Sequence, residues 1–125
     1  MILDSSFIID LFNKDTQAIE HARDFEEGES IKVSTISVFE VCFGISGEKK
    51  LTKADEFFDS TIILDVNRTI ARRAATLGQE LQKKGLLIDP EDCVIAATAI
   101  LENEPIVTRN VKHFSRIPGL KIVTY

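Results

Sequence analysis

The sequence predicts a single α/β domain with a mainly parallel central sheet of about five strands flanked by helices. Short apolar or β-branched runs alternate with longer stretches of helical periodicity, in the order β-α-α-β-α-α-β-α-α-β-α-β. The short connections between these segments favour parallel strands joined by helical crossovers. A length of 125 residues corresponds to one domain, residues 1–125, which is long enough to bury a core.

The first half of the chain opens with a strand over residues 1–4, an apolar run that ends in an acid. Ser5 and Ser6 then supply an N-cap for a helix that carries Phe7 and Phe12. The same reasoning predicts, in order, a helix over 16–27 that Gly28 ends, a strand over 31–33, a helix over 35–44, a weaker helix over 53–59 and a strand over 61–64.

The second half contains two longer helices and two further strands. Asn67 caps a helix whose apolar residues recur at helical spacing until it stops near Gly85. A strongly apolar helix follows, with Asp89 at its N-cap and Pro90 at its first position. This helix is expected over 89–101, and the last strands over 106–108 and 121–124.

Composition excludes several classes of protein. Hydrophobic residues make up 44% of the chain and charged residues 28%, which is typical of a globular domain and not of a disordered one. No apolar run approaches the ~18 residues that span a bilayer. The first four residues reach an acid without a basic region, so we expect no secretory signal. Cys42 and Cys93 are too few for a disulfide framework, and they fit a reducing cytoplasm.

The net charge argues against a nucleic-acid-binding protein. There are 15 Lys and Arg residues against 20 Asp and Glu, which gives −5, and the isoelectric point is about 5.0. An acidic domain repels the phosphate backbone unless its charge is distributed unevenly or offset by a cation.

Four polar side chains follow strands or begin helices at the edge where an α/β sheet carries its site: Asp4, Glu40, Asp92 and Asn110. Carboxylates that meet there would repel one another unless a cation lay between them. Mg²⁺ takes oxygen ligands of this kind together with water and substrate phosphates. The pattern therefore predicts metal-assisted chemistry on phosphate esters.

Each of these residues also has a purely structural interpretation. Asp4 could end a strand, and Asn110 could occupy a turn. Glu40 completes an S-x-x-E capping box with Ser37, although a helix that starts near position 35 leaves it beyond the cap. Asp92 is a typical first-turn acid. The case for a site depends on their joint placement.

Four segments resemble PIN-domain proteins, and within that family the chain most resembles VapC-type toxins of prokaryotic toxin–antitoxin pairs. The resemblance is weak over residues 47–87. The matching segments are MILDSSFIID at the start, STISVFEV from position 34, DCVIAATA from position 92 and IVTRNVKHFSRIPGL from position 106.

The resemblance implies a PIN-like fold and a Mg²⁺- or Mn²⁺-dependent endoribonuclease. It further implies a homodimer, an RNA substrate and inhibition by a VapB-type antitoxin. Asp4, Glu40 and Asp92 fall on the family's three acidic positions and would hold the metal ion.

The remaining family positions are less acidic here. Asn110 falls on the fourth acidic position, where an amide supplies no charge, and His113 stands where many relatives have a further Asp. The resemblance assigns Asn110 to the catalytic set, and Ser5 and Thr108 to hydrogen bonds that hold the acids. A lone His is more often structural, which is the interpretation favoured for His113.

Three basic residues flank Asn110 and are the candidates for RNA-phosphate contacts: Arg109, Lys112 and Arg116. Arg72 and Arg73 are weaker candidates. Most other Lys and Arg residues are expected to be solvated. If three carboxylates share one pocket, a divalent ion would turn that pocket from repelling phosphate to attracting it.

Apolar stripes over 7–12 and 38–45 are expected to pack in the core, or to form a groove for an antitoxin helix or a second copy. Two alternative functions remain open. One is a PIN-fold RNA- or partner-binding protein in which Asn110 weakens catalysis. The other, less favoured, is a phosphate-receiver signalling domain with Asp65 as acceptor and Thr108 after the fourth strand.

Overall fold

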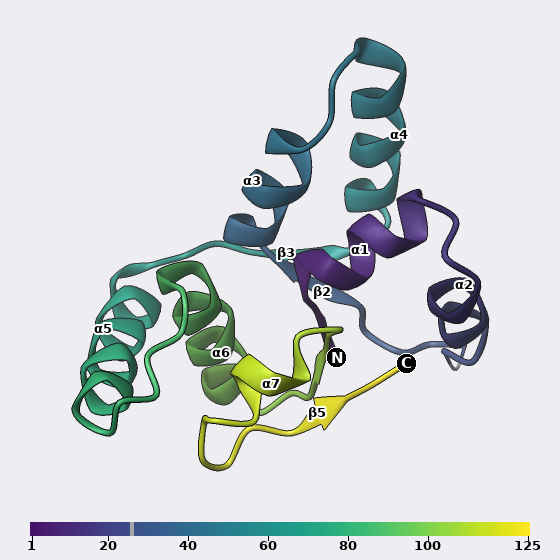
Figure 1. The fold of residues 1–125 in the computed structure, drawn as a ribbon. Coiled ribbons are helices and arrows are strands. Elements are labelled where there is room, and N and C mark those ends of the chain that lie inside the picture. Colours follow the sequence, from purple (N-terminus) through teal and green to yellow (C-terminus); the bar gives the residue numbers. More distant parts are fainter. Residues whose placement is uncertain (26) are drawn as a thin grey trace.

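Five short strands form one sheet in the order β3-β2-β1-β4-β5 in the computed structural model, which describes residues 1–25 and 27–125 (Figure 1). Every neighbouring pair is parallel. A phosphate-receiver domain has the order 2-1-3-4-5, so that alternative is wrong. The strands are β1 (Ile2–Leu3), β2 (Lys32–Ser34), β3 (Ile62–Leu64), β4 (Ile106–Val107) and β5 (Ile122–Val123).

The helices alternate with the strands in the predicted order. Within the described residues they are α1 (Ser5–Phe12), α2 (Thr16–Arg23), α3 (Thr35–Phe43), α4 (Glu48–Asp59), α5 (Arg68–Lys83), α6 (Pro90–Glu102) and α7 (Val111–Phe114). Helices α1 to α4 lie on one side of the sheet and α5 to α7 on the other (Figure 1). No described helix is long and apolar enough to cross a membrane.

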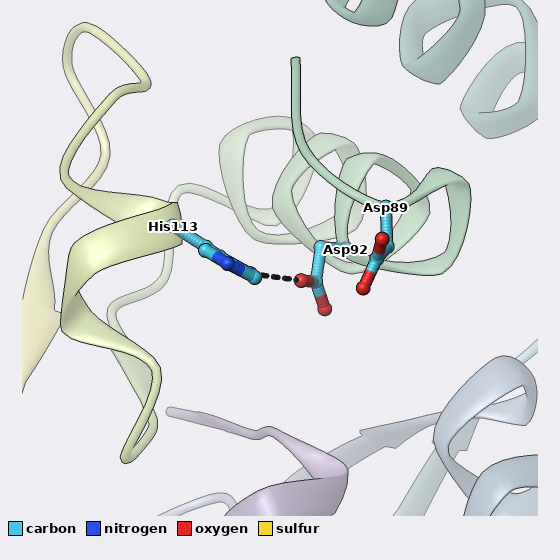
Figure 2. Close-up of side chains that lie close together, drawn as sticks. All are labelled: Asp89, Asp92 and His113. Carbon is cyan, nitrogen blue, oxygen red and sulfur yellow. Dashed lines mark hydrogen bonds and ion pairs between the residues drawn. The ribbon is translucent and has the colours of Figure 1, made fainter. Parts of the chain in front are cut away.

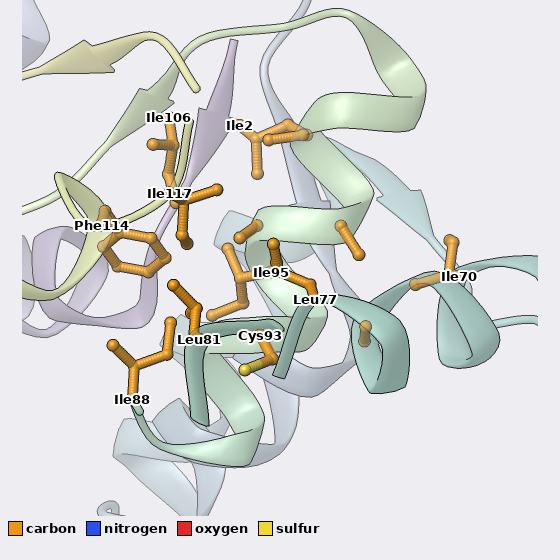
Figure 3. Close-up of a cluster of buried hydrophobic side chains, with 14 residues drawn as sticks. Ile2, Ile70, Leu77, Leu81, Ile88, Cys93, Ile95, Ile106, Phe114 and Ile117 are labelled. Atoms are coloured by element: carbon orange, nitrogen blue, oxygen red, sulfur yellow. The ribbon is translucent and has the colours of Figure 1, made fainter. Parts of the chain in front are cut away.

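The sheet separates two hydrophobic cores because successive strand residues point to opposite faces. Ile2 and Ile106 are fully buried against α5, α6 and α7, together with Phe114 (Figure 3). Leu3 and Val107, the next residue of each strand, belong to the other core, which α1 to α4 cover. This alternation fixes which way each strand end points, and therefore where the residues that follow it lie.

Two helix boundaries differ from the prediction. Helix α2 ends at Arg23, with Asp24 at its C-cap, and does not continue to 27; acidic residues at positions 24 and 27 oppose the negative end of the helix dipole. Position 26 of that expected helix lies outside the described residues. Helix α4 begins at Glu48, five residues before the predicted start, because its N-cap is Gly47 at φ 95°, which provides no side-chain cap to read in the sequence.

Candidate active site

Asp4 lies at the centre of the sheet's carboxyl edge, where β1 ends and α1 begins. Its side chain is 1% exposed. Oδ2 accepts hydrogen bonds from Ser6 Oγ and from Thr108 Oγ1, each at 2.7 Å. Oδ1 is buried and has no hydrogen-bond partner. One oxygen of this carboxylate is therefore fully used by the protein, and the other is left free inside the fold.

Glu40 approaches the same region from α3, which begins directly after β2. Ser34 caps this helix by accepting a hydrogen bond from the Ile36 N–H at 3.2 Å, so Glu40 lies beyond the cap, as predicted. Ser5 Oγ donates to Glu40 Oε1 at 3.2 Å. Burial raises the pKa of Glu40 to about 7, and the charges of Asp4 and Asp92 add to the increase.

Asp92 belongs to the first turn of α6 and is 7% exposed. Its Oδ2 lies 3.1 Å from Nδ1 of His113 on α7 (Figure 2). Burial raises the pKa of Asp92, the hydrogen bond from His113 opposes that increase, and the charge of Asp4 adds to it. The mutual effect of these carboxylates on one another shows that the fold brings Asp4, Glu40 and Asp92 into one electrostatic cluster.

Asp89 extends this cluster to the surface. Ligand atoms of Asp89, Asp92 and His113 all lie within 4.8 Å of one another, which makes these three the described set close enough to share one ion. Asp89 and Asp92 project side by side from the start of α6 (Figure 2). Asp4 and Glu40 are outside this set.

The loop after β4 is tied to Asp4 through Thr108, which is fully buried. Besides donating to Asp4, Thr108 Oγ1 accepts a hydrogen bond from the Asn110 N–H at 2.9 Å. Asn110 is the N-cap of α7, and it is exposed. The structure therefore places the Asn110 backbone next to the acids, while its side chain has no described hydrogen bond.

Arg109 is held by a second buried acid. Its guanidinium forms an ion pair of 2.5 Å with Asp10, which is 6% exposed and also accepts from the Tyr125 hydroxyl at 2.6 Å. The Arg109 N–H donates to Ser6 Oγ at 3.1 Å. This network connects α1, the loop after β4 and Tyr125, so Arg109 positions the loop. To reach RNA with its guanidinium, Arg109 would have to leave Asp10.

The other two basic candidates differ from each other. Arg116 donates to the carbonyl of Leu87 at 3.0 Å and so braces the segment that leads into α6. Lys112 is exposed on α7, next to His113, and has no described ion pair.

The donor set fits a hard divalent cation. A buried carboxylate oxygen without a partner is costly unless another group satisfies it. Asp4 Oδ1 is such an atom, and burial together with the neighbouring carboxylates raises the pKa values of Glu40 and Asp92, which disfavours their charged forms unless a cation is bound. Carboxylate oxygens suit Mg²⁺ and Mn²⁺, and a histidine nitrogen close to Asp92 is a ligand that Mn²⁺ accepts more readily.

Comparison with known proteins matches the PIN domain model over residues 1–120. Ribonuclease VapC1 of Methanocaldococcus jannaschii is 35% identical over 124 residues, which cover 98% of this chain and 85% of that protein. The chain belongs to the PIN-domain family of VapC ribonucleases. Ribonuclease VapC19 of Mycobacterium tuberculosis is a further relative, 31% identical over 121 residues and 96% of each chain.

The PIN fold is also seen in a solved relative. A chain of the Rickettsia felis VapBC2 complex, bound to a DNA fragment from the promoter, superimposes with a TM-score of 0.87. It is 29% identical and covers 99% of this chain, while this chain covers 97% of it. The predicted PIN-like α/β fold is therefore confirmed over 99% of the chain.

Sequence reasoning missed three side chains at this site of the PIN domain. The sequence predicts Asp89 only as a helix start, although acids at i and i+3 of a first turn share one face. It predicts Ser6 as a cap, and no pattern indicates Asp10, because its partners Arg109 and Tyr125 are distant in sequence.

Proposed function

We propose that this PIN domain cleaves RNA internally, as a Mg²⁺- or Mn²⁺-dependent endoribonuclease that acts as the toxin of a VapBC-type pair. The observation that carries the proposal is the free, buried Oδ1 of Asp4 beside two carboxyl groups whose pKa values are raised. Asp4, Glu40 and Asp92 would hold the ion, and Asp89 and His113 extend the donor set at Asp92.

The protein's own contribution is orientation. Ser6 and Thr108 fix Asp4 through Oδ2, which leaves Oδ1 without a hydrogen-bond partner, while Ser5 holds Glu40 and His113 holds Asp92. A bound divalent ion supplies Lewis-acid polarisation of a phosphate oxygen and lowers the pKa of a coordinated water. Asp4 or Asp92 would orient the attacking water, and the exposed Asn110 and Lys112 at the start of α7 would contact the substrate strand.

The test is cleavage of a panel of structured RNAs by the wild-type chain, Asp4→Asn and Asp92→Asn, with Asp55→Asn as the control. Asp55 is an exposed acid on α4, so the control removes the same charge away from the cluster. We expect cleavage to require added Mg²⁺ or Mn²⁺, and to fall by at least about a hundredfold in the two site variants only. Metal-dependent cleavage by a purified double variant would refute the assignment.

Asn110 motivates a second candidate function, a PIN-fold protein that binds RNA or a partner with weakened catalysis. The amide supplies no charge at the fourth acidic position. RNA binding without turnover in the same panel would favour this candidate. Restored cleavage in Asn110→Asp would identify the missing carboxylate as the cause.

We also propose a cytoplasmic location, a VapB-type antitoxin and a homodimer as partners. Phe39 and Phe43 support an assembly surface because they lie on α3 with exposed fractions of 58% and 82%. Their rings are 5.7 Å apart and form one apolar patch. Co-purification with the product of the neighbouring reading frame tests the antitoxin. Light scattering of the wild-type chain and of Phe43→Ser tests the homodimer.

A further inference from the structure

Helix α5 lies beside α6 (Figure 1). A basic groove lined by both helices lies near the end of α6 that is opposite Asp92. Its volume is about 360 Å³, and its lining residues are Arg68, Thr69, Arg72, Arg73, Thr76 and Leu101. Asp92 is in the first turn of α6 and Leu101 near the end, a separation of about 14 Å along the helix axis. The groove is therefore distinct from the acid cluster.

The three arginines of the groove are exposed and have no acidic partner among the residues that the structure describes. None of them belongs to a described ion pair, whereas Lys32 and Arg109 are both paired with acids. This concentration of free positive charge occurs in a chain whose net charge is −5. A local basic groove on an acidic molecule attracts phosphate where the average surface repels it.

The placement of these arginines opposes helix stability. Arg68 is the first residue of α5, where the helix dipole is positive, and the first turn contains no acid. Arg68 and Arg72 are like charges at i and i+4, which repel across one turn. No described contact compensates for this arrangement, and a bound anion would. Local rules that are broken without structural gain are expected at functional surfaces.

The apolar part of the groove lining favours a nucleic-acid strand over a simple anion. Leu101 is 47% exposed beside the arginines, so an apolar surface adjoins the positive charge. Bases of single-stranded RNA pack on apolar side chains and on planar guanidinium groups, while phosphates pair with the same arginines.

We propose that this groove binds the phosphate backbone of single-stranded RNA, and so anchors a part of the strand that the acids do not contact. The proposal rests on the ribonuclease function proposed above. Because the groove and Asp92 are farther apart than neighbouring phosphates, one strand would touch both with different nucleotides. The groove would therefore affect RNA affinity more than the rate of the cleavage step.

The test compares R68Q/R72Q/R73Q with K49Q/K50Q/K53Q, a control that removes the same charge from exposed positions of α4. Affinity for a fluorescein-labelled oligouridylate is measured by anisotropy in EDTA at several salt concentrations. We expect the arginine variant to bind about tenfold more weakly, with a salt slope smaller by about 2, and the control to change less than about twofold. The melting temperature of the arginine variant should match or exceed that of the wild-type chain, because repulsion between like charges on α5 has been removed.

Unchanged RNA affinity in the arginine variant, or equal losses in both variants, would overturn the proposal. Loss of binding to an acidic partner protein with RNA affinity retained would also overturn it. Because the assay in EDTA reads binding without cleavage, an inactive wild-type chain would count against the proposed ribonuclease and not against the groove.

Discussion

The two oxygens of the Asp4 carboxylate have opposite environments. Two hydroxyl groups saturate Oδ2, and Oδ1 is buried without a partner. A protein that only needed a strand end here would pair both atoms or expose them, because an unsatisfied buried acceptor costs about 1–3 kcal/mol. This cost is removed only if a further ligand, such as a cation, binds Oδ1.

Glu40 makes the metal-free protein sensitive to pH. Its pKa is about 7 in the folded chain against an ordinary value of 4.5, so folding favours the protonated form. The free-energy cost of ionising Glu40 in the folded chain is absent below about pH 4.5 and complete above pH 7. The free energy of unfolding therefore falls as the pH rises from about 4.5 to 7. Glu40→Gln should remove the penalty and gain about 1–2 kcal/mol at pH 8 after allowance for solvent screening.

Urea unfolding in EDTA at pH 5 and pH 8 measures this effect. Glu56→Gln, on the exposed face of α4, is the matched control and should show the wild-type pH dependence. If Glu40→Gln and the wild-type chain lose stability equally between the two pH values, the raised pKa of Glu40 is refuted.

Thr108 holds both Asp4 and the Asn110 backbone with one hydroxyl. Thr108→Val keeps the shape and removes both hydrogen bonds, so it should lower the free energy of unfolding by about 1–3 kcal/mol. Thr108→Ser retains the hydroxyl and should lose less. Chemical denaturation of the three proteins decides the order, and a valine variant as stable as the wild-type chain would contradict it.

At the scale of elements, only some caps were predictable. The predicted Ser5–Ser6 cap is wrong, because Asp4 is the N-cap of α1 and both serines lie inside the helix. Asn67 accepts a hydrogen bond from the Ile70 N–H at 2.9 Å, as its position in the sequence indicated. Gly47 starts α4 through its backbone conformation alone, so the sequence contained no polar signal for it. Residues whose periodicity is strong, such as those of α5, could be assigned from the pattern; helix ends depend on tertiary contacts that a pattern does not contain.

Helix α5 contains an unfavourable glycine in its interior. A Cβ at Gly78 would lie 3.5 Å from Cys93 Sγ, which is ordinary van der Waals contact. Gly78→Ala should therefore stabilise the protein by about 0.5–1 kcal/mol through helix propensity. Gly85→Ala is the contrasting variant and should destabilise, because Gly85 has φ +69°. Thermal unfolding should show a higher melting temperature than the wild-type chain for Gly78→Ala and a lower one for Gly85→Ala.

At the scale of the whole molecule, the sheet order explains why distant residues meet. Strands β2, β1 and β4 are neighbours, so the residues after them gather at one edge. The strand-end rule therefore pointed to Asp4 from the order of strands and helices alone, whereas the role of Thr108 was predicted from the family resemblance. It could not identify the pairing of His113 with Asp92 or of Arg109 with Asp10, because these contacts depend on how α7 and α1 pack.

Metal binding should stabilise the folded molecule. Mn²⁺ or Mg²⁺ at about a hundred times its dissociation constant should add about 2.7 kcal/mol to the free energy of unfolding, if the unfolded chain does not bind it. Asp4→Asn and Asp92→Asn should lose most of this gain, and Asp55→Asn should keep it. Thermal shift titrations with each metal give the measurement, and an equal gain in all four proteins would contradict the proposed ligands.

RNA affinity should respond to the same ion because the acids repel phosphate until a cation offsets them. With cleavage limited by short incubation on ice, binding of a labelled RNA should strengthen on adding Mg²⁺ and weaken in EDTA. Equal affinity in both conditions would mean that the acidic cluster does not control access of the strand.

The hydrogen bond between Thr108 and Asp4 joins residues 104 positions apart. Contacts of such long range form late, after most of the chain has been made and β4 has joined the sheet. A nascent chain on the ribosome therefore has its first acid but not the hydroxyl that orients it, and Asp92 is still to come. The acid cluster and its orienting hydroxyl can therefore assemble only after synthesis has passed residue 108.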